Sequence, residues 1–419
     1  MFHQSVSTSR AVDPRTAAHR DPDRPIRIAH VVSHPIQYFA PLYRALDARP
    51  EVDVTVYFLS DSSLRRHYDP GFGKHFDWDV DLATGYRYRL VSGAVGREPG
   101  RGIFQRPRWE VLRELLSNDY DVFWLHGYND ASIALAAALG RATGRRVMIR
   151  EEQTLLEPRP LLKRAVKEAA LRLLFSGVDG LYLGQASKEF FRHFGVPESR
   201  LFRVPYCADT PYLDARATEL APQRATIRRR LGIDDNEPAI LFAGKLVQRK
   251  TPESVLAAFQ QVRERQRCWL VFAGDGQQRA ALEEQVRRSQ TPNVVILGFV
   301  NQTGLPEVYA AADIFVLPSL FNETWGVVVN EAMAFGLPVI VSDHVGCAGD
   351  LVRSGWNGFV TPAGDVRQLS DAFRTVVENE VLRRRFGDNS RSLIRNYSVD
   401  ASADALVLAA RADAGCAQA

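Results

Sequence analysis

Residues 314–341 read IFVLPSLFNETWGVVVNEAMAFGLPVIV, a short apolar run, a segment of helical character and a second apolar run. The runs 314–317 and 339–341 have the composition of buried strands. Asn322 is a suitable cap for the segment between them, so a helix is expected over residues 324–335. A strand, a helix and a strand joined by short connections predict two parallel strands of one sheet.

The same alternation continues in both directions along the 419-residue chain. It predicts an α/β protein of two doubly wound domains in tandem. The expected domains are a disordered tail (1–24), an N-terminal domain (25–208), a C-terminal domain (209–395) that opens with an arginine-rich linker, and a last helix (396–419) that packs back on the N-terminal domain. Strands are expected at 26–32, 52–59, 121–125, 146–149, 180–183, 239–243, 269–273 and 294–297, and helices at 38–48, 131–139, 161–175, 252–265, 277–288 and 305–311.

Composition excludes several classes of protein. The chain carries 53 Lys and Arg against 49 Asp and Glu, too even a balance for a nucleic-acid binder. No stretch approaches eighteen apolar residues, as a spanning helix requires, and no signal peptide is recognisable. The four cysteines form no C-x-x-C pair, which argues against a zinc site or a disulfide scaffold. These features predict a cytoplasmic protein.

Two carboxylates, Glu323 and Glu331, flank the start of the expected helix at 324–335. Apart from Asn330 and Glu331 this helix is apolar nearly all round, which indicates burial, and a buried carboxylate is costly without a hydrogen-bond partner. Hydroxyl groups of a ligand can serve as that partner, while the free N–H groups of the helix start suit an anion. The alternative is one surface cap and one internal salt bridge.

Loops at the ends of other expected strands carry further candidates. Residues 242–250 place Lys245 and Lys250 after a strand, where lysines neutralise phosphate oxygens unless they are simply solvated. Glycines at 274 and 276 flank Asp275 in a loop where a nucleotide can approach the backbone, although such turns are common. His126 follows another strand and is either structural or part of the site. The pair Asp77 and Asp79 has a metal-binding spacing but fits an exposed acidic strand better.

These motifs occur together over residues 238–365 in an order that resembles the retaining glycosyltransferases of family 4. The resemblance implies the GT-B fold, in which two doubly wound domains face a cleft. It rests on loop 244–246, turn 274–276, residues 298–299, the E-x7-E segment and residues 357–358. In the first half of the chain the likeness is architectural only.

The resemblance also implies roles for individual residues. Glu331 would bind the donor ribose, Glu323 the sugar hydroxyls, and Lys245 and Lys250 the diphosphate, while His126 would lie near the transferred sugar. The remaining donor-binding residues by resemblance are Gly244, Thr324, Trp325, Gly326, Val327, Gly274 and Asp275.

The chain departs from the family pattern at three places. The family usually has arginine where Lys245 stands, so bidentate clamping is lost. Loop 33–38 lacks the usual glycines, and His34, Gln37 and Tyr38 offer hydrogen bonds instead. Residues 346–350 differ from the family's phosphate-side loop. Acceptor identity is therefore the property least defined by the sequence.

The expected function is transfer of a sugar from a nucleoside diphosphate sugar to a glycan or lipid-linked acceptor with retention of configuration, in exopolysaccharide or surface-glycan synthesis. No cofactor and no metal are expected. Two alternatives stay open, a GT-B sugar-nucleotide epimerase and a non-catalytic protein that binds a sugar nucleotide or glycan. Basic residues on the helix at 161–175, namely Lys163, Arg164, Lys167 and Arg172, also suggest peripheral membrane contact, with an ordinary sheet-covering helix as the alternative.

Overall fold

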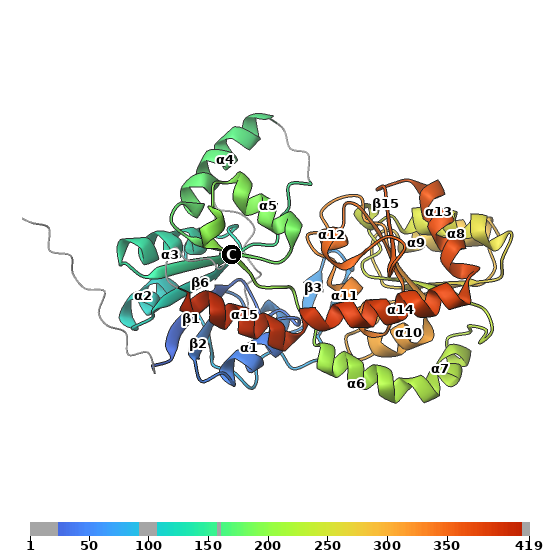
Figure 1. The fold of residues 1–419 in the computed structure, drawn as a ribbon, viewed down its shortest axis with the longest axis horizontal. Coiled ribbons are helices and arrows are strands. Elements are labelled where there is room, and N and C mark those ends of the chain that lie inside the picture. The colour runs from blue at the N-terminus through green and yellow to red at the C-terminus, as the bar shows by residue number, and fades with distance from the viewer. Residues whose placement is uncertain (1–23, 92–106, 157–160, 413–419) are drawn as a thin grey trace, which may run out of the picture.

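The computed structural model describes residues 24–91, 107–156 and 161–412, with the side chains of residues 161–166 outside that description. Two lobes lie side by side along the longest axis of the molecule (Figure 1). Each lobe is built around a parallel sheet covered by helices, which confirms the expected α/β class with two doubly wound domains. The tail expected over residues 1–24 lies outside the described residues except for Arg24.

The N-terminal lobe contains a seven-stranded parallel sheet in the order β5-β2-β1-β6-β7-β8-β9. Apolar runs form its central strands because both faces are covered, so that Ile28, Phe123 and Ile149 are fully buried. Its strands are β1 (Ile26–Val32), β2 (Val52–Phe58), β5 (Tyr88–Leu90), β6 (Val122–His126), β7 (Arg146–Arg150), β8 (Asp179–Tyr182) and β9 (Leu201–Arg203). Its helices are α1 (Ala40–Asp47), α2 (Trp109–Ser117), α3 (Ala131–Ala142), α4 (Leu161–Phe175) and α5 (Gln185–His193).

The C-terminal lobe contains a six-stranded parallel sheet in the order β12-β11-β10-β13-β14-β15. Residue Phe315 pairs with Val339, so residues 314–341 form the predicted parallel unit. The strands are β10 (Ala239–Ala243), β11 (Trp269–Ala273), β12 (Val294–Gly298), β13 (Ile314–Leu317), β14 (Val339–Ser342) and β15 (Gly358–Thr361). The helices are α6 (Thr210–Leu220), α7 (Arg224–Arg230), α8 (Pro252–Arg263), α9 (Arg279–Arg288), α10 (Leu305–Ala311), α11 (Val327–Ala334), α12 (Ala348–Leu351), α13 (Val366–Val377) and α14 (Glu380–Ile394).

Two expectations about local structure are wrong. The arginine-rich stretch after residue 209 is not an extended linker but forms α6 and α7, and Arg228 is 1% exposed because Asp313 and the carbonyl of Ala311 satisfy its guanidinium. Helix α11 begins at Val327 rather than at residue 324, because Gly326 has a left-handed φ of 93° and interrupts the helical geometry. Asn322 is therefore not its cap.

A small antiparallel hairpin connects the lobes on the cleft side. Its strands are β3 (His67–Asp69) and β4 (Lys74–Phe76), which belong to the N-terminal half of the sequence but lie between the lobes (Figure 1). Strands of three residues are too short to show a hydrophobic period, so periodicity did not predict these two strands. The pair Asp77 and Asp79 follows β4 in a coil rather than in the exposed strand expected there.

The last helix, α15 (Val399–Arg411), lies against the N-terminal lobe beside α1 (Figure 1). Arg49, just after α1, forms ion pairs of 2.9 Å with both Asp400 and Asp404. Arg146 donates a hydrogen bond of 3.1 Å to the carbonyl of Ala410. These contacts join the end of the chain to the first domain.

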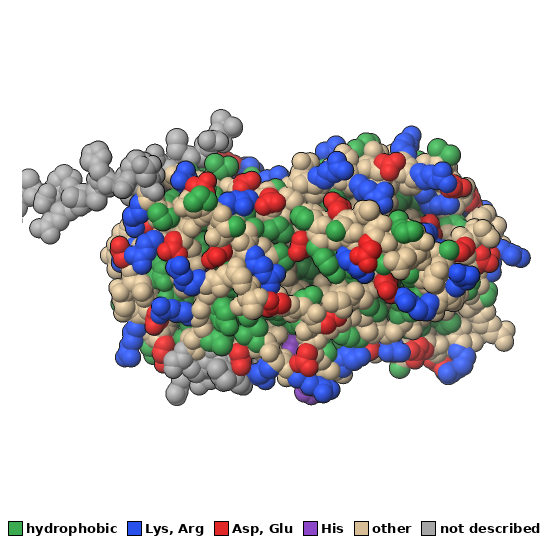
Figure 2. All heavy atoms as spheres, turned by 90° about the horizontal axis from the view of Figure 1, so that it is seen from below, with side chains coloured by type: hydrophobic (Ala, Val, Ile, Leu, Met, Phe, Trp, Pro, Cys, Tyr) green, Lys and Arg blue, Asp and Glu red, His purple; other side chains and the backbone are tan. Residues whose placement is uncertain are grey.

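The surface carries charges of both signs. Figure 2 shows Lys and Arg interspersed with Asp and Glu across one face of both lobes, without a large area of a single sign. Among the described helices, none has the length and hydropathy needed to cross a membrane. In α4, Leu171 and Phe175 pack into the core under the sheet, whereas Leu173 is 71% exposed.

Candidate functional site

The loops that follow β10 and β11 face the N-terminal half of the chain, since Lys245 and Asp275 pair with Asp69 and Lys74 of the β3–β4 hairpin. Doubly wound folds bind ligands at this end of their strands. The loops after β10 and β11 touch at backbone distance, because a Cβ on Gly274 would lie 1.8 Å from the carbonyl oxygen of Gly244. Only glycine fits at position 274. These loops, with Lys245, Lys250 and residues of the β3–β4 hairpin, line a cavity of 220 Å³, which we call the lysine cavity.

Lys245 and Lys250 both line the lysine cavity, but they differ in burial and in partner. Lys250 is 6% exposed and its Nζ lies 2.9 Å from Oε2 of Glu323. The Nζ of Lys245 lies 2.8 Å from a carboxylate oxygen of Asp69, which belongs to β3 of the other domain. Neither lysine is merely solvated, so the alternative considered for them is excluded.

Glu323 lies in the loop between β13 and α11, at the centre of a cationic cluster. Besides Lys250, its Oε2 lies 3.2 Å from Arg249 and accepts a hydrogen bond of 3.1 Å from the hydroxyl of Ser319. Burial alone would raise the pKa of this carboxyl, but the charges of Lys250 and Arg249 outweigh burial and lower it. Glu323 is therefore ionised at neutral pH and holds Lys250 at the edge of the lysine cavity.

Glu331 lies in α11 and is 4% exposed, as the apolar character of that helix predicted. Its Oε2 accepts a hydrogen bond of 2.7 Å from the hydroxyl of Tyr309 in α10. Burial raises the pKa of Glu331 to about 7, against which the hydrogen bonds of Tyr309 and Tyr38 act only partly. The carboxyl is thus poised between its two protonation states near neutral pH, and its partners are hydroxyl groups.

Glu331 lines a second cavity of 310 Å³ between α1 and α10, which we call the carboxyl cavity. The two cavities adjoin, because Gln37, Tyr38, Gln302 and Leu305 line both. Gln37 and Tyr38 come from the first loop of the N-terminal domain, where the sequence had indicated hydrogen-bonding groups. An elongated ligand can therefore reach the lysines at one end and Glu331 at the other.

Other predicted donor residues lie near this site without lining either cavity. The side chain of Trp325 is 2% exposed, and its indole N–H donates to Asn330, which in turn binds the carbonyl of Tyr206 at the domain crossing. Asp275 forms ion pairs of 3.1 Å with Lys74 and Arg279. Neither cavity is lined by the other four predicted residues, which are Glu323, Thr324, Gly326 and Val327. Their contact with a donor stays a prediction.

His126 ends strand β6 in the N-terminal domain. Its Nε2 lies 3.5 Å from Oε1 of Glu152, and its buried Nδ1 has no hydrogen-bond partner among the residues that the structure describes. The ring meets Phe39 edge-on with 4.9 Å between centroids. It lines neither the lysine cavity nor the carboxyl cavity, and its proposed place near a transferred sugar stays a prediction.

Sequence reasoning did not select Tyr309, Asp69 or Phe72 as site residues. Tyr309 lies 22 positions before Glu331, and its role follows only from the packing of α10 on α11. Asp69 ends the first strand of a hairpin that carried no periodic signal, and Phe72 lies in its turn. Glycines 71 and 73 between two polar-aromatic segments were the available sign of a turn.

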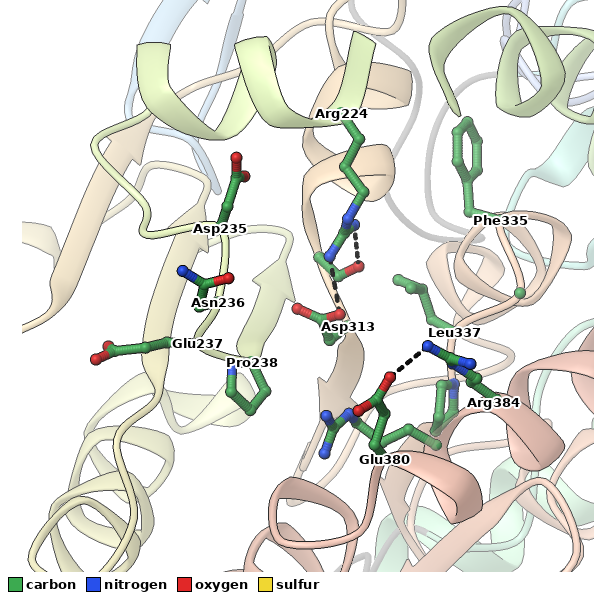
Figure 3. A pocket seen from close by; sticks show the side chains of 14 residues that line it. Arg224, Asp235, Asn236, Glu237, Pro238, Asp313, Phe335, Leu337, Glu380 and Arg384 are labelled. Carbon is green, nitrogen blue, oxygen red and sulfur yellow. Dashed lines mark hydrogen bonds and ion pairs between the residues drawn. The ribbon is translucent and has the colours of Figure 1, made fainter. Parts of the chain in front are cut away.

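A further cavity of 550 Å³ lies at the opposite edge of the same sheet, where the residues before β10, β13 and β14 line it. Two ion pairs lie among its lining residues, Arg224 with Asp313 at 2.8 Å and Arg384 with Glu380 (Figure 3). It contains none of the predicted site residues.

Comparison with known proteins agrees with this geometry. Residues 223–393 match the family described as Glycosyl transferases group 1. The alpha-D-kanosaminyltransferase of Streptomyces kanamyceticus is 30% identical over 247 residues, which cover 58% of this chain and 61% of that protein. The phosphatidyl-myo-inositol mannosyltransferase of Mycobacterium leprae is 29% identical over 298 residues, or 68% and 72% of the two chains.

The match to the first of these relatives thus spans less than two thirds of its length. Among solved structures, Anabaena Alr3699/HepE in complex with UDP and glucose superposes with a TM-score of 0.65 at 17% identity, over 91% of this chain and 98% of that one. This likeness covers 91% of the chain and concerns the fold. Residues 223–393 are therefore similar to the glycosyl transferases group 1, and the chain has the GT-B fold.

Proposed function

We propose that this protein is a retaining glycosyltransferase that moves a sugar from a nucleoside diphosphate sugar to a glycan or lipid-linked acceptor. The observation that carries the proposal is the pair of adjoining cavities, one lined by two lysines and the other by a buried carboxylate. The diphosphate of a donor lies against Lys245 and Lys250, and its ribose hydroxyls hydrogen-bond Glu331. The family match over residues 223–393 and the UDP complex of a structurally similar protein support this assignment.

In this proposal the main chemical task is to stabilise the departing diphosphate. Negative charge on the phosphate oxygens grows as the sugar bond breaks, and prearranged cations in a site sheltered from water stabilise that charge. Lys250 is suited to this task because Glu323 fixes its ammonium at 2.9 Å before any ligand binds. Glu323 meets the sugar hydroxyls from the same position, and His126 approaches the sugar from the N-terminal domain.

The reaction needs no nucleophilic side chain in this scheme. The acceptor hydroxyl attacks the anomeric carbon on the face that the diphosphate leaves, and a phosphate oxygen takes its proton. Configuration is then retained. We expect turnover to need no metal ion, since the lysines supply the positive charge.

The proposed setting is the cytoplasmic side of a membrane at which surface glycans are made. In α4 the described part of the basic cluster is engaged with protein, since Lys167 lies 4.8 Å from the ring centroid of Tyr128 and Arg172 pairs with Glu168. Lys163 and Arg164 lie outside the described side chains. The exposed Leu173 supports peripheral contact, whereas the buried Leu171 supports the sheet-covering alternative.

The test is donor turnover by the purified protein in EDTA, with UDP-, GDP-, ADP- and TDP-glucose offered beside a panel of sugar acceptors. Release of a nucleoside diphosphate together with a new α-glycoside, both abolished by Glu331→Ala, is the expected result. An altered sugar nucleotide without loss of the diphosphate would indicate an epimerase. Binding without any turnover would indicate a non-catalytic binding protein.

A further inference from the structure

The turn of the β3–β4 hairpin covers the lysine side of the proposed donor site. Lys245 Nζ lies 2.9 and 2.8 Å from the two carboxylate oxygens of Asp69, and 4.9 Å from the ring centroid of Phe72. We propose that Asp69 competes with the donor, its carboxylate occupying Lys245 until the diphosphate of a donor replaces it. This inference rests on the function proposed above and names a residue outside the family motif.

The Asp69 carboxylate is held much as a phosphate would be. Its Oδ1 accepts hydrogen bonds of 2.7 Å from the N–H of Gly71 and 3.0 Å from the N–H of Phe72, in addition to the lysine. Burial acts to raise the pKa of Asp69, but the hydrogen bond and charge of Lys245 lower it, so the group is charged at neutral pH. The turn fits closely over the lysine, since a Cβ on Gly71 would lie 2.5 Å from the Lys245 Cδ.

The hairpin is anchored to the C-terminal domain by other contacts as well. Lys74 forms an ion pair of 3.1 Å with Asp275, and Asn301 donates a hydrogen bond of 2.8 Å to the carbonyl of Asp77. The ring of Phe76 lies 4.6 Å from that of Phe299 between centroids. Because these contacts do not involve Lys245, the ion pair of Asp69 can open while the hairpin stays docked.

The outcome of this competition follows from the negative charge that each partner brings to Lys245. A diphosphate brings at least two negative charges to Lys245 and Lys250, whereas Asp69 offers one, so the exchange favours the ligand. A nucleoside without phosphate brings none and leaves the ion pair intact. Asp69 therefore lowers the affinity for diphosphates without changing the affinity for the nucleoside portion.

The test is calorimetric titration of the wild type and of Asp69→Asn. The probes are UDP, GDP, ADP and TDP, followed by the nucleoside of whichever diphosphate binds most tightly. Asparagine keeps the oxygen that accepts from Gly71 and Phe72 but removes the charge. We expect the Kd of the diphosphate to fall about fivefold in the variant, the range of a partly exposed ion pair, and the Kd of the nucleoside to stay unchanged.

Lys74→Met is the matched control, because it breaks an ion pair of the same hairpin without touching Lys245. Competition is supported if the diphosphate binds more tightly to Asp69→Asn than to the wild type while its Kd for Lys74→Met stays unchanged. An equal gain in diphosphate affinity in both variants would overturn the inference, since it would reflect a loosened hairpin. An unchanged or weaker Kd in Asp69→Asn would overturn it while leaving the donor site standing, and no binding to any of the three proteins would overturn both.

Discussion

Glu331→Gln should stabilise the protein at alkaline pH while it abolishes donor binding. The carboxyl is 4% exposed and its Oε2 accepts one hydrogen bond of 2.7 Å from Tyr309. Glutamine has nearly the same shape and retains an oxygen that can accept this bond. The substitution therefore removes the charge from a buried site and leaves the packing of α11 in place.

The magnitude follows from the raised pKa. Burial raises the pKa of Glu331 from 4.5 to about 7, so between these values the folded state binds more protons than the unfolded state. Stability contributed by this group is therefore lost as pH rises through that range. At 1.36 kcal/mol per unit, the wild type should lose about 2 to 3 kcal/mol relative to Glu331→Gln between pH 5 and pH 8.

Differential scanning calorimetry at the two pH values measures this change. The melting temperature of Glu331→Gln minus that of the wild type should grow by about 2 to 4 °C from pH 5 to pH 8, as expected for a chain of 419 residues. Glu151, whose pKa burial also raises to about 7, titrates in the same range, but it does so in both proteins and cancels in the difference. A difference that stays constant with pH would refute the reasoning that Glu331 is an energetically costly buried carboxylate.

Three other substitutions distinguish residues needed for donor binding or turnover from residues needed only for stability. Lys250→Met should slow donor turnover about 10²-fold, and normal turnover would contradict the assigned role. The same substitution should lower the unfolding free energy in urea by about 3 kcal/mol, because Glu323 loses a buried partner. Arg228→Met should cost about 3 kcal/mol in the same urea assay, since it leaves buried carbonyls unpaired, while the nucleotide Kd from calorimetry stays unchanged. Gly274→Ala should abolish nucleotide binding in that calorimetric assay, because its Cβ would lie 1.8 Å from the Gly244 carbonyl oxygen, and retained affinity would show that the two loops need not approach so closely.

The parallel architecture could be predicted because local pattern and tertiary context agree. Residues 314–341 form strand, helix and strand in the expected order, and their strands pair in parallel. The failures lie where local pattern was silent or ambiguous. Arg228 lies in the arginine-rich stretch that was predicted to be a linker, yet it is buried and pairs at 3.0 Å with Asp313, which is distant in sequence.

The site was predictable in its residues more than in their partners. The apolar surroundings of Glu331 in sequence predicted its burial, which the structure shows. Lys245 and Lys250 line one cavity, while their predicted contact with a diphosphate stays a prediction. The partner of Lys245 is Asp69, 176 positions away, and no local feature of either segment indicates that contact. Contacts across a domain cleft depend on how the two domains are placed relative to each other. The hydrophobic periodicity within each domain carries no information on that placement.

The most direct test of the central claim is titration of UDP, GDP, ADP and TDP into the wild type and Glu331→Ala in the presence of EDTA. The account predicts that one diphosphate binds the wild type without metal and that the variant loses this binding while its melting profile remains cooperative. Equal affinity in both proteins, or binding that requires a metal ion, would contradict a donor site built from Glu331 and the two lysines.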